Sequence, residues 1–181
     1  KIGSIRIFVH RDIEGKIKTC TIKKDHLGHW YATLVSEIED VPPVDPKIAI
    51  GVDVGLKNLV ALSTGGTIQY PRYYVQAQQK LAVAQRNLSR KKKGSANRRK
   101  AKAKVAKISQ DVQNHRDEFL HQVSRTLVDS ADLIVFENLN ISGMLKNHHL
   151  AKHIQDHAWG KLIQFTQSKA AKAGKVVELV D

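Results

Sequence analysis

The sequence has very little cysteine and no long apolar run. Cys20 is the single cysteine in 181 residues, which excludes an internal disulfide and every zinc site built on paired cysteines. The longest apolar runs, such as Ile48–Ile50 and Leu133–Phe136, are far too short to span a bilayer. No signal-peptide pattern opens the chain. We therefore expect a cytoplasmic protein that has no membrane partner.

Acidic residues are also scarce, and one long stretch has none. Lysine and arginine number 30 against 17 aspartates and glutamates, which leaves a net charge of +13 and favours a polyanionic partner. No acid occurs from Val54 to Gln110, and the segment from Arg86 to Lys107 holds 11 lysines and arginines. A solvated helix face could carry such a run, but its density favours contacts with nucleic-acid phosphates. The residues that we expect to make these contacts are Lys57, Arg86, Arg90, Lys91, Lys92, Lys93, Arg98, Arg99 and Lys100.

The first forty residues alternate between apolar and polar side chains. This pattern predicts a three-stranded antiparallel meander over Ile5–Val9, Ile17–Thr21 and Trp30–Ser36. The segment Val41–Pro46 contains three prolines, which cannot continue a ladder or a helix. We therefore place a domain boundary there, between a β-rich segment over 1–46 and a main domain over 47–181.

The main domain begins with strands. An apolar strand runs from Lys47 to Asp53, and two further strands over Leu59–Ser63 and Thr67–Tyr70 are joined by a turn at Gly65-Gly66. These three strands should lie antiparallel. Later apolar runs predict a strand that ends at Glu137 and a final strand over Lys175–Val180, so the domain belongs to the α/β class with a mixed sheet.

From Tyr73 the apolar period becomes helical. It predicts a basic helical hairpin over about 73–129, with a glycine break and Ser95 as the N-cap of the second helix. A last helix over Ala158–Ala173 should end at Gly174. Between these helices we expect Asn138–His157 to be a loop, part of which, Ile141–Asp156, is suited to cover a nearby site as a lid.

The histidines and the tryptophan of this region leave alternatives open. His149, His153 and His157 recur at four-residue steps, a spacing that suits metal ligands along one helix face. Because no glutamate or cysteine accompanies them, we expect ordinary loop or helix-start residues instead. Trp159 could stack on a nucleobase, although an aromatic residue at the start of an apolar helix is more often part of the core.

Asp53 and Glu137 each end an apolar strand. If the two strands are neighbours in the sheet, the acids meet at its edge, where their mutual repulsion calls for a cation between them. Mg²⁺ is the natural candidate because it takes hard oxygen ligands and acts on phosphodiesters. Each acid could instead be a turn residue, and the Gly-x-Asp-x-Gly pattern around Asp53 is also similar to the first phosphate-binding strand of actin-like ATPases.

Four motifs in this order closely resemble the TnpB (OrfB) family of insertion-sequence proteins. These motifs are Ile50–Leu59, Leu88–Ser95, Asp132–Leu139 and His157–Gly160. The resemblance covers nearly the whole chain. It implies an RNase H-like (RuvC-type) core of an RNA-guided DNA nuclease, related to the type V CRISPR effectors and historically described as a transposase. It also implies DNA and guide RNA as partners.

The resemblance assigns Asp53 and Glu137 as the first and second catalytic, metal-binding carboxylates, with Mg²⁺ as the cofactor and Mn²⁺ as its substitute. It places residues 1–46 in the tail of the family's wedge, or β-barrel, domain. Family members continue past the strand that matches Lys175–Val180 into a Zn²⁺-binding ribbon and a helix with a third catalytic Asp. Neither lies in this sequence, so we expect a fragment that cleaves weakly or not at all, and we do not assign that role to Asp181. The alternative is a DNA- or RNA-binding module without catalysis.

Overall fold

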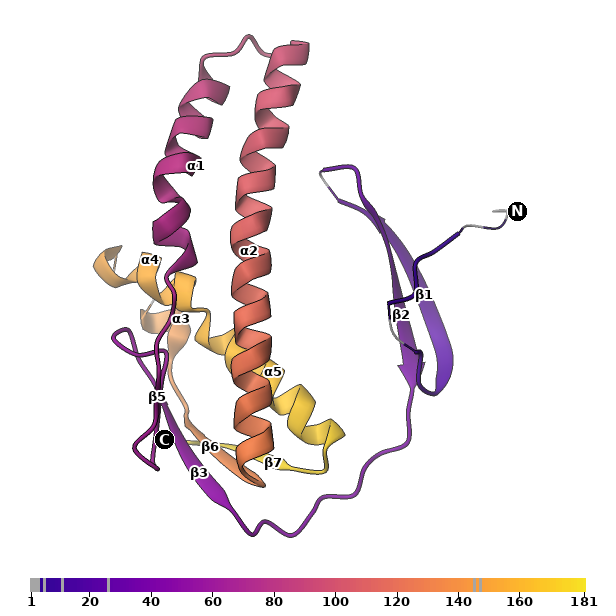
Figure 1. Ribbon diagram of the computed structural model, residues 1–181, viewed down its shortest axis with the longest axis vertical. Coiled ribbons are helices and arrows are strands. Elements are labelled where there is room, and N and C mark those ends of the chain that lie inside the picture. Colours follow the sequence, from indigo (N-terminus) through magenta and orange to yellow (C-terminus); the bar gives the residue numbers. More distant parts are fainter. Residues whose placement is uncertain (1–3, 5, 11, 26, 145, 147) are drawn as a thin grey trace. The chain divides into compact units, whose positions relative to one another are not determined.

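A computed structural model of the chain describes residues 4, 6–10, 12–25, 27–144, 146 and 148–181 (Figure 1). The chain divides into two compact units, Lys1–Asp40 and Val41–Asp181. The proline-rich segment predicted as a boundary falls within the second unit, where the Val44 amide donates to the Gly174 carbonyl at 2.7 Å. Gly174 has a φ of +67°, and a side chain there would collide with the Pro42 carbonyl oxygen.

The first unit contains one antiparallel pair, β1 (Lys16–Lys24) with β2 (Trp30–Glu37). The strand expected over Ile5–Val9 is wrong for the part that the structure describes, since residues 6–10 form no strand. Phe8 is 91% exposed there, so these apolar side chains have no surface against which a third strand could pack. Every residue of β1 is exposed as well.

The second unit is built on a mixed five-stranded sheet of order β5-β4-β3-β6-β7. Its strands are β3 (Ala49–Val54), β4 (Val60–Leu62), β5 (Thr67–Ile68), β6 (Leu133–Glu137) and β7 (Val176–Val180). The first three lie antiparallel, as predicted, with the turn at Gly65-Gly66. Strands β6 and β7 run parallel to β3, which brings the carboxyl ends of three strands to one edge of the sheet.

The relative register of β3 and β6 is fixed at the opposite edge. The Asp132 carboxylate accepts hydrogen bonds at 3.2 Å from the backbone amides of Lys47 and Ile48, and these bonds hold the pKa of Asp132 below its usual value. The Ile48 carbonyl in turn accepts from the Asp132 and Leu133 amides. A shift of the β3–β6 register by one residue would turn every side chain of one strand to the other face of the sheet. The Asp132 contact therefore determines which residues of β3 and β6 lie side by side at their carboxyl ends.

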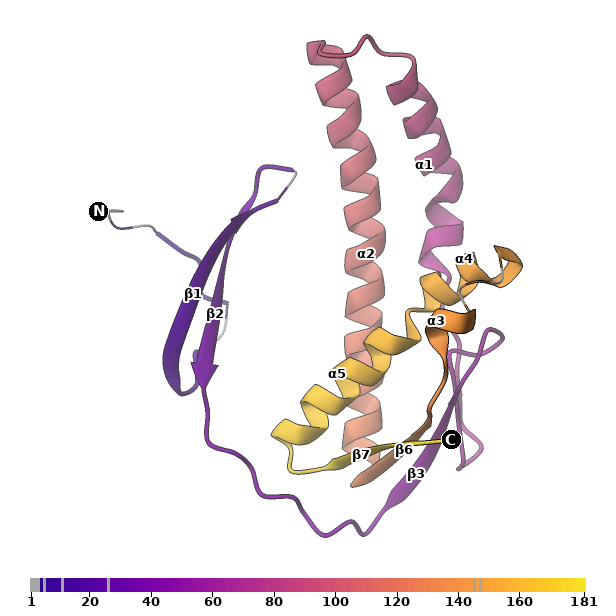
Figure 2. The ribbon, with the colours of Figure 1, turned by 180° about the vertical axis from the view of Figure 1, so that it is seen from behind.

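The predicted helical hairpin is confirmed. Helix α1 (Tyr73–Ser89) and helix α2 (Ala96–Ser130) lie side by side and antiparallel in both views (Figures 1 and 2). At 35 residues, α2 is about 52 Å long at 1.5 Å per residue. Gly94 turns the chain with a φ of +82°, and the Ser95 hydroxyl accepts from the Arg98 amide at 3.1 Å as the predicted N-cap.

The loop expected over Asn138–His157 is confirmed only for Asn138–Asn140, and most of the remaining described residues are helical. They form α3 (Ile141–Met144) and α4 (His148–His157), and α5 (Trp159–Lys172) follows as predicted. The helical period was hidden because two of the inward-facing positions at the end of α4 are polar. Ile154 is buried there together with Asp156 and His157.

The core lies between one face of the sheet and the helices α2 and α5. Ile50 and Val52 of β3 and Phe136 of β6 point into it, while the alternate residues of these strands are half-buried or exposed. Within the described chain, the second face of the sheet is therefore less buried than the face that packs on α2 and α5. Trp159 is buried, so the expected core role is confirmed. Within the part of the chain that the structure describes, no helix combines the length and the apolar character needed to cross a bilayer.

Candidate active site and nucleic-acid interface

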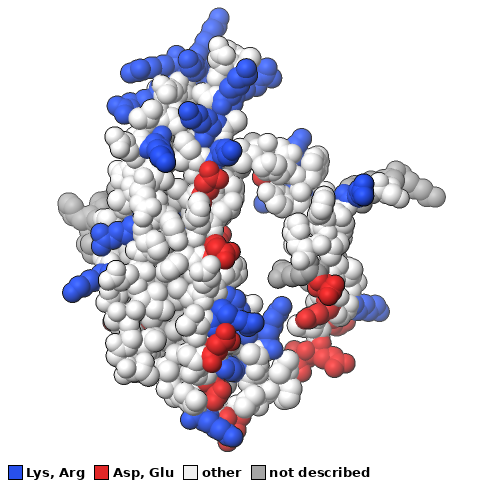
Figure 3. All heavy atoms as spheres, viewed as in Figure 1, with Lys and Arg blue, Asp and Glu red and all other residues white. Residues whose placement is uncertain are grey.

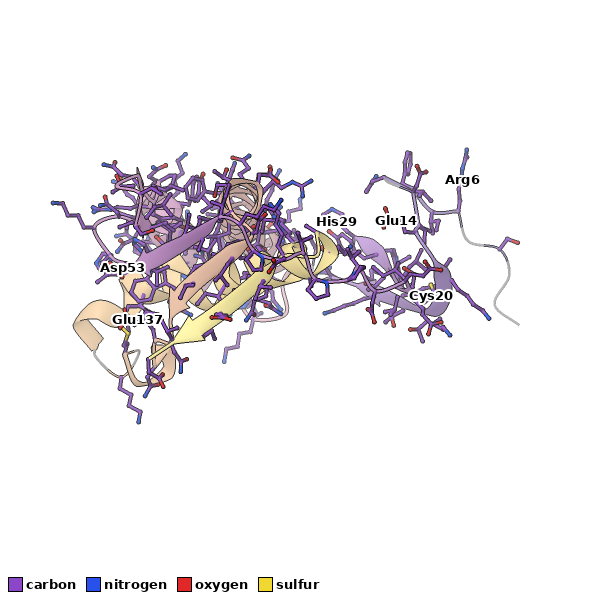
Figure 4. All side chains as sticks on the ribbon, turned by 90° about the horizontal axis from the view of Figure 1, so that it is seen from below. Arg6, Glu14, Cys20, His29, Asp53 and Glu137 are labelled. Atoms are coloured by element: carbon purple, nitrogen blue, oxygen red, sulfur yellow. The ribbon has the colours of Figure 1, made fainter. Side chains whose placement is uncertain are left out.

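Asp53 and Glu137 lie at the carboxyl ends of neighbouring parallel strands, where Asp53 is the last residue but one of β3 and Glu137 is the last of β6. The register pairs Ala49 with Leu133 and Val52 with Phe136, so the next step along both strands brings Asp53 beside Glu137. Adjacent strands lie about 4.8 Å apart, and residues at matched positions of parallel strands face the same side. Figure 4 shows both side chains at the same edge of the sheet. The sequence-based expectation that the two strands are neighbours is therefore confirmed.

Both carboxylates are exposed, and neither forms an ion pair with another described residue. Two carboxylates side by side without a cationic partner suit a divalent ion with hard oxygen ligands. The described residues contain no group of three or more His, Cys, Asp or Glu side chains arranged to hold a metal. The two acids at this edge have the oxygen donors that such an ion takes, and within the described residues no third side chain of this kind joins them.

Asp181 follows β7 at the same edge but is tied to another group. Its carboxylate accepts from the Asn138 side-chain amide at 2.8 Å, and the Asn138 backbone amide donates to the Val180 carbonyl at 2.7 Å. Glu137 is paired with Val180, so Asp181, one residue later, faces the opposite side from Glu137 by strand alternation. The geometry gives no reason to count Asp181 with the two strand-end acids.

The basic cluster lies at the free end of the helical hairpin. We use the name basic tip for the eleven lysines and arginines between Arg86 and Lys107. Lys and Arg side chains gather at this end of the hairpin, and the acids of α2 lie further down (Figure 3). Arg90, Lys91, Lys92 and Lys93 are all exposed in the turn, as are Arg86, Arg99 and Lys100 on the two helices. Lys57 is exposed in the turn after β3, away from the hairpin in the sequence.

Arg98 differs from the other predicted phosphate contacts. Its guanidinium donates to the Leu88 carbonyl at 3.0 Å, near the end of α1, and to the Lys91 carbonyl at 3.1 Å, in the turn that follows. The Ser95 hydroxyl donates to the Lys92 carbonyl at 2.8 Å in the same turn. Part of the basic tip therefore holds the turn in shape, and the neighbouring cations are presented on a hydrogen-bonded loop.

A buried polar cluster at the base of the hairpin was not predicted. The Asp156 carboxylate, 3% exposed, accepts from Arg116 at 3.0 Å and from the Tyr70 hydroxyl at 3.3 Å. Burial and the nearby Asp156 charge raise the pKa of Tyr70 far above its usual value. The one signal in the sequence was Arg116 itself, a charged residue on the apolar face of α2. The cluster joins the ends of β5 and α4 to the middle of α2.

Among the regularly spaced histidines, His157 has a well-defined environment in the described residues. His157 is buried, its ring lies 4.6 Å from that of Tyr70, and its Nδ1 lies 2.7 Å from the His153 carbonyl. Burial lowers the pKa of His157, which favours the neutral imidazole. The side chain of His149 lies outside the described residues. His157 is thus a buried residue at the end of α4, and the expectation of an ordinary loop or helix-start residue is wrong for it.

Two curated proteins are similar to this chain in sequence. Both carry the name "Putative RNA-guided DNA endonuclease". One, from Streptomyces pristinaespiralis, is 39% identical over 163 residues, which cover 90% of this chain and 40% of the relative. The other, InsQ from Escherichia coli strain K12, is 34% identical over 148 residues, which cover 81% and 37%. The chain therefore spans about two fifths of the length of these relatives.

A solved structure and a family model complete the comparison. The cryo-EM structure of a Cas12f1-sgRNA-target DNA complex contains a chain similar to 88% of this one, with a TM-score of 0.50 and 15% identity, over 41% of its own length. At that identity the likeness concerns the fold alone. The model of the OrfB_IS605 family, described as "Probable transposase", matches residues 32–148. The match includes Asp53, Glu137 and the whole basic tip, and with it the resemblance drawn from the four motifs is confirmed: the chain belongs to the OrfB_IS605 family of transposases.

Proposed function

We propose that the chain is the RNase H-like (RuvC-type) core of an RNA-guided DNA endonuclease. The observation that carries the proposal is the placement of Asp53 and Glu137 at the ends of adjacent parallel strands. The names of the two relatives support the choice of activity, and the strand order β5-β4-β3-β6-β7 supports the fold type. The substrate is a DNA phosphodiester, and guide RNA is the second nucleic-acid partner.

In this proposal Asp53 and Glu137 hold Mg²⁺, for which Mn²⁺ can substitute. A bound magnesium ion would stabilise the charge that develops on phosphate oxygens during hydrolysis. The protein's own contribution is to keep two carboxylates together through the β3–β6 register that Asp132 fixes. The exposed cations of the basic tip hold the nucleic-acid backbone, without reading its sequence.

A DNA- or RNA-binding module without catalysis is the second candidate. It is favoured by the number of acids, because the described residues group no third metal-binding side chain with Asp53 and Glu137. Such a module would use the same basic tip, while the acid pair would bind an ion too weakly, or with too few ligands, to promote cleavage.

Metal binding tests the proposal without requiring turnover. Titration of Mn²⁺ by electron paramagnetic resonance should show a site that Asp53→Ala or Glu137→Ala removes. Asp129→Ala is the matched control, because Asp129 is an exposed carboxylate at the far end of α2. Cleavage of labelled DNA in Mg²⁺ or Mn²⁺ should then follow the same order of variants.

The results separate the two candidates. Loss of Mn²⁺ binding and of cleavage in both acid variants supports the nuclease. Metal binding by the acids without any cleavage favours the binding module for this chain. Equal Mn²⁺ affinity in the wild type, Asp53→Ala and Asp129→Ala removes the metal-site assignment altogether.

A further inference from the structure

A groove opens between the two long helices, below the basic tip. The groove is partly open to solvent and has a volume of about 230 Å³, which is smaller than the roughly 300–1,000 Å³ of sites for drug-sized ligands. Side chains from α1, from the middle of α2 and from the start of α5 line it, among them Tyr74, Leu81, Ser109, Gln113, Arg116 and Lys161. The space suits one small ring system rather than a larger molecule.

The lining combines an aromatic ring with polar groups. Tyr74 and Leu81, seven residues apart on α1, supply a flat and apolar side, and Ser109 and Gln113 supply exposed hydrogen-bonding groups on α2. Lys161 adds a cation that is 34% exposed and paired with Asp117 at 2.6 Å. A nucleobase has the matching chemistry, since its two faces stack on aromatic rings and its edges carry donors and acceptors.

An acid-free surface connects the groove to the basic tip. Along one side of α2, steps of three and four residues place Lys102, Ala106, Ser109, Gln113 and Arg116 in one row, which contains no acid. Helix α1 contains no acid over its whole length.

The opposite side of α2 behaves differently. There the same spacing leads from Lys100, Lys104 and Lys107 to Asp111 and Glu118, which are exposed and would repel phosphates. A nucleic-acid strand that extends from the basic tip along α2 would therefore contact only neutral and basic side chains on the row that leads to the groove. On the opposite side of α2 it would contact acids.

The tip and the groove also differ in their aromatic content. No Phe, Trp or Tyr occurs between Val75 and Glu118, so the tip can hold phosphates but offers no ring on which a base could stack. Tyr74 is the last aromatic residue before the tip. We propose that the groove takes one unstacked nucleobase of a single-stranded DNA or RNA whose phosphates lie on the basic tip, with Tyr74 as the stacking ring. This inference rests on the proposed nucleic-acid role of the tip.

Binding measurements on the whole chain test this inference, because they need no catalysis. Fluorescence anisotropy with single-stranded DNA, single-stranded RNA and a DNA duplex of equal length should show a selective loss in Tyr74→Ala. Stacking is worth about 1–3 kcal/mol per base, so single-strand affinity should fall about 5- to 150-fold while duplex affinity stays unchanged. Tyr74→Phe keeps the ring and should retain most of the affinity. The loss in the DNA or the RNA arm tells which strand the groove takes.

Controls separate the groove from the fold and from the tip. Val75→Ala changes an exposed neighbour on α1 and should leave all affinities unaltered. Gln113→Glu, an exposed change that preserves the helix, should weaken single-strand binding several-fold, whereas Gln122→Glu on the same helix should not. Alanines at Lys91, Lys92 and Lys93 should weaken single strands and duplex together.

Three results would overturn the inference. The first is an unchanged single-strand affinity in Tyr74→Ala and in Gln113→Glu, which would leave the tip as the binding surface without the groove. The second is an equal loss for single strands and duplex in Tyr74→Ala. The third is a wild type that binds none of the three nucleic acids, in which case the nucleic-acid role of the tip fails as well.

Discussion

Charge is handled in opposite ways at the two ends of the α1–α2 hairpin. At its base, Arg116 is 20% exposed and donates to Asp156, which also accepts from the Tyr70 hydroxyl. At its free end, the basic tip gathers cations over a stretch without any acid. A buried charge needs an opposite charge or hydrogen-bond partners inside the protein. An exposed cluster of cations is solvated by water and stays available for binding to a polyanion. We infer that the base serves folding and that the tip serves binding.

The largest expected effect is on stability at the base. Asp156→Ala leaves the Arg116 guanidinium largely buried without its carboxylate, which should lower the free energy of unfolding by about 3–5 kcal/mol. Urea denaturation followed by circular dichroism measures it. The control is Asp129→Ala, because Asp129 pairs with Arg125 at 3.6 Å on the surface and both side chains are 64% exposed. That change should cost less than about 1 kcal/mol, and equal losses would contradict the difference between base and surface.

The next effect concerns binding at the tip. Replacing Lys91, Lys92 and Lys93 with alanine should reduce the salt dependence of nucleic-acid affinity, by about 0.7–0.9 in logarithmic slope for each lost phosphate contact. The free energy of unfolding should change by less than about 0.5 kcal/mol, as expected for exposed positions. Affinity measured over a range of salt concentrations checks the slope. An unchanged slope would mean that these side chains point away from the nucleic acid.

Arg98 tests the comparison between base and tip directly. It lies at the tip, but like Arg116 at the base it forms its hydrogen bonds within the protein. Its two bonds to backbone carbonyls hold the end of α1. Arg98→Ala should therefore increase amide hydrogen exchange around the turn as well as weaken binding. If it behaves like the three lysines and leaves exchange unaltered, the division between structural and binding cations is wrong.

A smaller effect is expected from the cap of α2. Ser95→Ala removes the acceptor of the Arg98 amide and should destabilise the first turn of α2 by about 1 kcal/mol. Hydrogen exchange of the Arg98 amide measures this locally. Ser89→Ala is the matched control, because the Ser89 hydroxyl only donates to the Arg86 carbonyl within α1. Equal protection in the two variants would contradict the capping role.

The elements with a regular pattern were predictable from the sequence. Strand alternation and chain order were enough to place Asp53 and Glu137 at strand ends, and the helical period with Ser95 was enough for the hairpin. The adjacency of the two acids remained conditional, because it depends on the β3–β6 register that the Asp132 carboxylate fixes across the sheet. Asp132 lies 85 positions from Lys47 and 84 positions from Ile48 in the sequence. A local sequence pattern contains no information on a contact over such a separation.

The unpredicted parts depend on contacts that are distant in the sequence. Helix α4 has few apolar inward positions, and its burial of Asp156 is possible only because Arg116 and Tyr70 supply the partners. The groove is lined from α1, α2 and α5, so no single segment shows it. At the other extreme, the apolar alternation at Ile5–Val9 predicted a strand that lacks a surface to pack on in the described residues.

The smallest expected effect is a dependence of stability on pH at the base of the hairpin. Burial lowers the pKa of His157 in the folded state, and the charges of His153 and Arg72 act in the same direction, against the His153 carbonyl and Asp156. The unfolded chain, with a histidine pKa of about 6.5, then takes up a proton more readily than the folded chain. The free energy of unfolding should therefore be constant above the unfolded pKa and fall as the pH drops below it.

His157→Gln removes this titration while it keeps a polar side chain of similar reach. Denaturation between about pH 7.5 and pH 5.5, a range that brackets the unfolded histidine pKa, should show a flatter pH dependence in the variant. His121→Gln is the comparison, because burial also lowers the pKa of His121, although that residue is exposed on α2 and stacks on Phe165. A larger flattening in His157→Gln than in His121→Gln is expected from the deeper burial of His157. The reverse order would place the pH-sensitive contact at the α2–α5 packing and not at the buried cluster around Asp156.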